Sequence, residues 1–82
     1  MMLDKINQIK EGYSEGFYKN NKYSITKEIF NEGKSFKIYA KELKGTDFIS
    51  LNYYITSSTE LLKPCEMPKQ KVIDFLNNVY LI

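Results

Sequence analysis

The sequence predicts an α+β fold, in which an antiparallel β-meander of three to five strands carries an N-terminal and a C-terminal helix packed on one face. Three observations predict it. Apolar residues recur at helical spacing near both ends of the chain, apolar and polar residues alternate in its middle, and Asn, Gly and Asp separate the alternating segments. The length of 82 residues suits one domain, so we expect a single domain over residues 1–82.

The N-terminal segment has the apolar spacing of a helix. Its apolar side chains recur at intervals close to one helical turn, at Leu3, Ile6, Ile9 and Tyr13. Asp4 suits the positive end of a helix dipole, and Gly12 is typical of a helix end. This pattern predicts a helix over residues 3–13.

The middle of the chain alternates between apolar and polar residues. This alternation predicts a hairpin joining residues 17–18 to 23–30, strands at 35–43 and 48–56, and a short segment at 60–63. The hairpin turn is expected at residues 19–22, because Asn tolerates left-handed backbone conformations. Further turns are expected at residues 31–34, with Gly33 at a positive φ, and at residues 44–47.

The C-terminal segment returns to helical spacing. Pro68 suits the first turn of a helix, and apolar residues follow at Val72, Ile73, Leu76, Val79 and Tyr80. The four apolar residues 79–82 have three possible roles: they complete the core, form a last strand or supply a dimer contact. We favour core completion, because so small a domain needs all of its apolar area.

Composition argues against several classes of function. The formal net charge is only +2, all twelve basic residues are Lys, and His is absent. The strong basic excess of a dedicated nucleic-acid binder is therefore missing, as are the commonest general base and the commonest metal ligand. The ten carboxylates are scattered, and no glycine-rich phosphate loop or zinc-binding cluster is present. We expect a protein that is not an enzyme and that needs no cofactor or metal.

The sequence also indicates where the protein acts. Its single cysteine, Cys65, favours a reducing compartment, the N-terminus lacks the apolar segment of a signal peptide, and no apolar run is long enough to span a membrane. We expect a cytoplasmic protein without a membrane partner. The abundance of Lys, Asn, Ile and Tyr is typical of small proteins from AT-rich bacteria or their phages.

The outer face of the predicted sheet is the main candidate binding surface. The alternation places aromatic and lysine side chains opposite the helices. This face carries Phe30 and a candidate binding set of Lys37, Tyr39, Lys41, Phe48, Asn52 and Tyr54. Such a surface can dock a protein, or it can stack bases and hold phosphates of a single-stranded nucleic acid. Aromatic residues also favour strands for their cross-strand packing alone.

Cys65 is a second candidate, because it precedes the predicted C-terminal helix. The positive end of the helix and nearby lysines would lower the pKa of a thiol there and favour an anion. Glu66 opposes both effects, and neither a His nor a second Cys is present to support thiol chemistry. The favoured interpretation is therefore a small hydrophobic residue at a corner between two prolines.

The order of helix, strands and helix is similar to that of double-stranded-RNA-binding domains. Their basic segment at the start of the last helix is matched only in part by residues 68–72, and the loop between their first two strands has no counterpart here. No residue role is carried over from that family.

These observations predict a non-catalytic binding module that regulates or inhibits a larger protein by protein–protein contact. The alternative is a single-stranded nucleic-acid-binding protein that uses the same aromatic and lysine face. A protein partner is expected, a homodimer is possible, and nucleic acid is the less favoured ligand.

Overall fold

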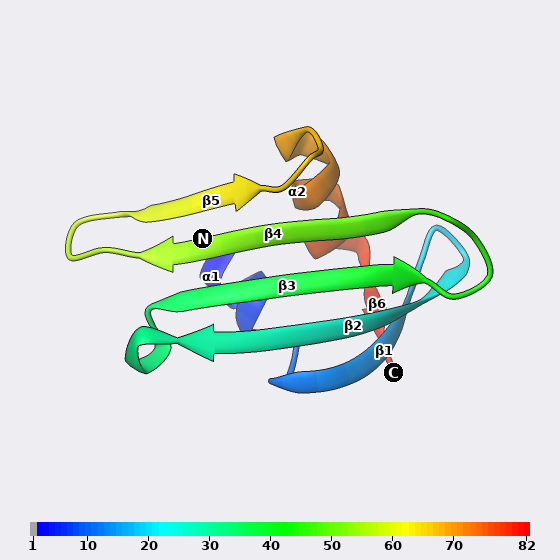
Figure 1. The fold of residues 1–82 in the computed structure, drawn as a ribbon, viewed down its shortest axis with the longest axis horizontal. Helices are drawn as coiled ribbons and strands as arrows, with labels where there is room; N and C mark the ends of the chain where they lie inside the picture. The colour runs from blue at the N-terminus through cyan, green and yellow to red at the C-terminus, as the bar shows by residue number, and fades with distance from the viewer. Residues whose placement is uncertain (1) are drawn as a thin grey trace.

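The computed structural model describes residues 2–82 and contains a twisted six-stranded antiparallel sheet with two short α-helices (Figure 1). The elements in chain order are α1 (Met2–Asn7), β1 (Gly12–Tyr18), β2 (Asn21–Phe30), the 3₁₀ turn η1 (Asn31–Gly33), β3 (Ser35–Glu42), β4 (Phe48–Ile55), β5 (Glu60–Pro64), α2 (Lys69–Asn78) and β6 (Tyr80–Leu81). The protein is thus an α+β protein built mainly of sheet.

The strand order in the sheet is β5-β4-β3-β2-β1-β6. The first five strands form a meander in chain order, and the sixth joins after α2, when the chain end returns to the free edge of β1. The predicted range of three to five strands is therefore wrong. Gly16 permits β6 to pair with β1, because glycine has no Cβ atom. A Cβ atom at this position would lie only 2.9 Å from the Tyr80 carbonyl oxygen.

The first helix is shorter than predicted: α1 ends at Asn7, and residues 12–18 form β1. The buried side chain of Lys27 explains the early end, because its Nζ donates hydrogen bonds to the carbonyl oxygens of Ile6 at 2.8 Å and Ile9 at 2.7 Å. Carbonyl groups at the end of a helix need such partners. Tyr13, assigned to the helix by its spacing, lies instead in β1 opposite Thr26.

The turn between β1 and β2 and the strands β3 to β5 lie close to the positions predicted from the sequence. Lys19 and Asn20 have φ values of 51° and 66°, the left-handed pair expected in a two-residue hairpin turn. The predicted strands 35–43 and 48–56 correspond to β3 and β4 with one residue less at the end, and the short predicted segment is β5. Local alternation and turn residues were sufficient to place these strands.

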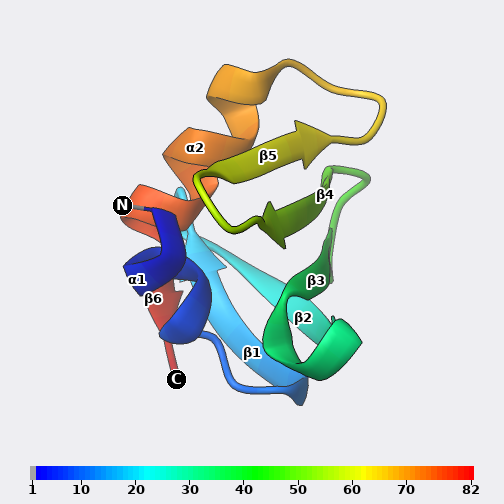
Figure 2. The same ribbon diagram turned by 90° about the vertical axis from the view of Figure 1, so that its left-hand side faces the viewer.

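The hydrophobic core lies between the sheet and the two helices, which are on the same side of the sheet (Figure 2). α2 contributes Val72, Phe75 and Leu76, and α1 with the residues after it contributes Ile6 and Ile9; all five are fully or almost fully buried. The opposite side of the sheet carries no element among residues 2–82. No helix within that described range is long and apolar enough to cross a membrane.

Candidate functional site

The structure brings the predicted binding residues together on the outer face of β3 and β4. Lys41 lies opposite Phe48 and Lys37 opposite Asn52, while Tyr39 and Tyr54 lie opposite the serines Ser50 and Ser35. The two lysines are exposed, as is Tyr39 with 42% of its surface accessible, and Phe48, Asn52 and Tyr54 are half-buried. Phe30, which was also expected on this face, is the last residue of β2 and is 47% exposed.

Two of these aromatic rings stack on each other. The ring centroids of Tyr39 and Phe48 are 6.0 Å apart, and the ring planes are inclined by 30°. They lie diagonally across neighbouring strands, because Tyr39 is opposite Ser50 and Phe48 is opposite Lys41. Such an offset stack is a favourable arrangement for aromatic side chains, so it orders the centre of this face.

β5 adds two residues that sequence reasoning did not assign to the site. Leu61 lies opposite Tyr54, and Lys63 lies opposite Asn52. Both are exposed, whereas the intervening Leu62 is buried in the core. The alternation around Leu62 was the signal that could have revealed them. We call the resulting eight residues the Lys–aromatic patch: Lys37, Tyr39, Lys41, Phe48, Asn52, Tyr54, Leu61 and Lys63.

The patch is positively charged. The outer positions of β3, β4 and β5 carry three lysines and no acidic residue. Within residues 2–82, the ion pairs join Lys22 to Glu15 at 3.2 Å and Lys71 to Asp47 at 2.5 Å, so none of the patch lysines is engaged in one. Their charges are available to a ligand.

On the other half of the outer face, formed by β1 and β2, Glu15 is bonded to two side chains of the protein. The Tyr13 hydroxyl donates a hydrogen bond to Glu15 at 2.6 Å, and Lys22 pairs with the other oxygen of the same carboxylate. The Tyr13 hydrogen bond, followed by the Lys22 contact, holds the pKa of Glu15 below its usual value. Glu28 is the cross-strand neighbour of Lys37 and marks the boundary between the halves.

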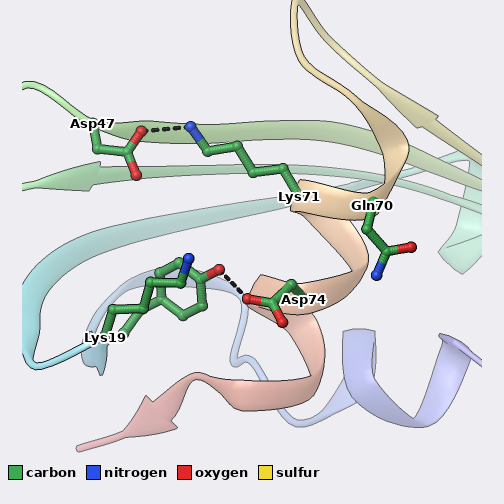
Figure 3. Close-up of a pocket in the computed structure, with 6 residues that line it drawn as sticks. Lys19, Asp47, Gln70, Lys71 and Asp74 are labelled. Carbon is green, nitrogen blue, oxygen red and sulfur yellow. Dashed lines mark hydrogen bonds and ion pairs between the residues drawn. The ribbon is translucent and has the colours of Figure 1, made fainter.

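A second polar feature is a pocket of about 500 Å³ between α2, the β1–β2 turn and the loop before β4 (Figure 3). It is lined by Tyr18, Lys19, Asp47, Gln70, Lys71 and Asp74. Lys19 also lies over the Tyr18 ring, with its Nζ 5.4 Å from the ring centroid. Figure 3 shows that Asp47 and Lys71 point toward each other, and the Tyr18 hydroxyl donates a hydrogen bond to Asp74.

Both carboxylates of the pocket accept hydrogen bonds from side chains of the protein. Asp47 accepts hydrogen bonds from Lys71 at 2.5 Å and from the Tyr23 hydroxyl at 2.9 Å. Asp74 accepts one from the Tyr18 hydroxyl and one from Asn78 Nδ2 at 3.0 Å. Each carboxylate oxygen therefore has a partner, which is the pattern of an anchor that holds α2 to the sheet.

The pKa values in this pocket fit an anchoring role. Burial, followed by the hydrogen bonds to the carboxylates, raises the pKa of the Tyr18 and Tyr23 hydroxyls. The hydrogen bond from Lys71 holds the pKa of Asp47 below its usual value. Each shift favours the protonation state that keeps the hydrogen bond. Among the described residues, no group of three or more Cys, Asp or Glu side chains is placed to hold a metal ion.

Cys65 lies beside the Lys–aromatic patch. Asn52 Nδ2 donates a hydrogen bond to its sulfur at 3.3 Å, and its backbone N–H donates to the Ser50 carbonyl oxygen at 2.9 Å. The thiol is half-buried. Lys71, a lysine close to this cysteine in sequence, is paired with Asp47. Cys65 therefore continues the β4–β5 pairing and orients Asn52.

The chain matches no family model, and it has no significant similarity to a curated protein or to a solved structure. A function for this protein therefore has to be argued from its own side chains.

Proposed function

We propose that this protein is a non-catalytic binding module that regulates or inhibits a larger protein. The module would dock on that partner through the outer face of its own sheet. The observation that carries the proposal is the Lys–aromatic patch, which combines exposed aromatic rings with lysines that form no ion pair among residues 2–82. The internally bonded carboxylates of the α2 pocket support a scaffold role for the rest of the polar network.

The composition of the patch supports a protein partner. Protein interfaces commonly have an apolar, aromatic centre surrounded by a polar rim. Here Tyr39, Phe48 and Tyr54 provide the aromatic groups, and Leu61 adds an aliphatic side chain that is 44% exposed. Exposed apolar side chains gathered on one face gain free energy when a partner removes them from water.

The test is capture of partner proteins from an extract of the source cells. We expect the wild-type protein to retain at least one partner. The double variant Tyr39→Ala, Tyr54→Ala should lose it, because the variant lacks both aromatic rings. A matched control is Tyr80→Ala in β6, whose side chain is 72% exposed and lies outside the patch. Recovery of the same partner by the double variant would disprove docking through this face.

Single-stranded nucleic acid is the second candidate ligand. The observation in its favour is that the Tyr39–Phe48 stack lies beside Lys37 and Lys41, an arrangement in which rings contact bases and lysines contact phosphates. With three lysine–phosphate contacts, the logarithm of the affinity should fall with a slope of about −2 against the logarithm of salt concentration. Fluorescence anisotropy with an oligonucleotide at low and high salt measures this, and absence of binding at low salt eliminates the candidate.

A further inference from the structure

We propose that the surface recognised by the Lys–aromatic patch is an acidic protein surface, with carboxylates around an apolar centre. This inference rests on the proposed function and specifies the chemistry of the partner. It follows from where the protein carries its net charge, from the spacing of the three lysines, and from the apolar residues beside them.

The formal charge of the whole chain is concentrated on the outer face. Of the twelve lysines and ten acidic residues, the outer strand positions hold Lys22, Lys37, Lys41 and Lys63 but only Glu15 and Glu28. The remaining eight lysines are matched by eight acidic residues, so the outer face alone accounts for the net charge of +2. Because Glu15 is paired with Lys22, the charges that remain on this face are those of the three patch lysines and of Glu28, the cross-strand neighbour of Lys37.

The lysines border the aromatic residues rather than form one cluster. Lys37 and Lys41 are four residues apart on β3, which places their Cα atoms about 13 Å apart. Lys63 is two strands from Lys37, across Asn52, a separation of about 10 Å. Tyr39 and Asn52 lie between these positions. A complementary partner therefore presents carboxylates around an apolar area, and the long lysine side chains can reach the rim of the contact.

The apolar residues favour a protein over a nucleic acid. Phe30, Tyr54 and Leu61 lie in one cross-strand row, separated only by Ser35, and Leu61 offers no group that contacts a base edge or a phosphate. In addition, the stack of Tyr39 with Phe48 already uses one face of each ring. Three lysine contacts without an arginine also make a weak electrostatic footprint for nucleic acid.

The experiment uses three fluorescent probes of twelve units: a peptide that alternates Glu and Leu, a peptide of Glu alone, and oligo(dT). Anisotropy at low salt measures the dissociation constant of each probe for the protein of residues 1–82. We expect the Glu–Leu peptide to bind about tenfold more tightly than either other probe, because only it offers both carboxylates and apolar contacts.

Charge-reversal variants locate the contact. The double variant Lys37→Glu, Lys41→Glu should weaken binding of the Glu–Leu peptide at least about tenfold, because like charges are then juxtaposed. The control variant Lys10→Glu, Lys69→Glu changes net charge equally at two exposed positions outside the patch, and it should change binding less than about twofold. Thermal unfolding of both variants verifies that each is folded.

Three outcomes would overturn the inference. Tightest binding of oligo(dT) would make the patch a nucleic-acid site, and equal loss in both charge-reversal variants would reduce the effect to general attraction between opposite charges. If neither peptide binds but Tyr39→Ala, Tyr54→Ala still loses a captured partner, the inference of an acidic partner is wrong. The proposed docking face would then still stand. Conversely, peptide binding without any effect of the tyrosine variant on capture would contradict the proposed function itself.

Discussion

Both halves of the outer sheet face carry aromatic and lysine side chains, but the contacts of their lysines differ. On β1 and β2, Glu15 accepts a hydrogen bond from Tyr13 and pairs with Lys22, so both the charge and the hydroxyl are satisfied within the protein. On β3 to β5, Lys37 and Lys41 have no carboxylate within ion-pair distance among the described residues. Exposure alone therefore does not identify a binding surface; what distinguishes the halves is whether their lysines are already paired with a carboxylate.

Both halves depend on the core beneath them, and removing a core ring should have the largest effect. Phe75 of α2 is fully buried and stacks edge-on against Tyr18 at 5.1 Å and Tyr23 at 5.9 Å. Replacing Phe75 with Ala should lower the free energy of unfolding by about 3–5 kcal/mol, through lost burial and a residual cavity. Urea denaturation measures this. A loss below about 1 kcal/mol would mean that α2 does not secure the sheet.

The next effect contrasts a lysine used by the fold with a lysine of the patch. Lys27→Met should lower the free energy of unfolding by about 1–3 kcal/mol, because the carbonyl groups of Ile6 and Ile9 lose their shared donor. The exposed Lys37→Met should change it by less than about 0.5 kcal/mol. Urea denaturation of both variants makes the comparison. Equal effects would contradict the assignment of Lys27 to the fold and Lys37 to binding.

The pH dependence of Lys27 sharpens the same contrast. Burial lowers the pKa of its ammonium group in the folded protein. The folded state therefore disfavours the charged form, and stability from this group rises as the pH increases from the folded pKa toward the unfolded value of about 10.4. The difference in unfolding free energy between wild type and Lys27→Met should grow over this alkaline range. A difference that stays constant with pH would show that Lys27 does not titrate there.

The ion pair of Asp47 with Lys71 of α2 should have a smaller effect, and its pH dependence has the same sign as that of Lys27 but lies in the acidic range. Because the folded pKa of Asp47 is lowered, its contribution is present above the unfolded pKa of about 3.9 and is lost as the pH falls through the folded pKa. Asp47→Asn should cost about 1 kcal/mol or less at neutral pH, since the Lys71 pair is partly exposed. Its stability should also depend less on pH below 5 than that of wild type, as urea denaturation across that range would show.

The smallest predicted effect comes from a substitution on the β1–β2 half of the outer face that leaves its lysine unpaired, as the lysines of the patch are. Glu15→Gln removes the partner of Lys22 and leaves a fourth unpaired lysine on the outer face. Binding of the Glu–Leu peptide should tighten by about twofold at low salt, whereas stability should change by less than about 0.5 kcal/mol. Anisotropy titration checks the first value and urea denaturation the second. Weaker binding by this variant would mean that Glu15 contacts the ligand.

The elements that depend on local patterns were predictable from the sequence. Alternation placed β3 and β4 to within one residue, Lys19 and Asn20 lie within the predicted hairpin turn, and Pro68 directly precedes α2. The six outer-face residues also follow from alternation, since a strand's period fixes which side chains share a face.

The features that depend on contacts between distant residues were not predictable. α1 ends early because Lys27, in a strand remote in sequence, caps it. β6 has only two residues, too few for a recognisable pattern, and it exists because it pairs with Gly16 and Phe17 of β1. The pairing of Lys22 with Glu15 likewise depends on strand register, so the sequence could not separate the two halves of the outer face.

The most direct test of docking through the Lys–aromatic patch is site-specific photo-crosslinking in the source cells. A photoreactive phenylalanine analogue replaces Tyr39 in one variant and Tyr80 in the other; both side chains are exposed, but only Tyr39 belongs to the patch. We predict a discrete protein adduct from position 39 and none from position 80. Adducts of equal yield at both positions, or an adduct at position 80 alone, would contradict docking through this patch.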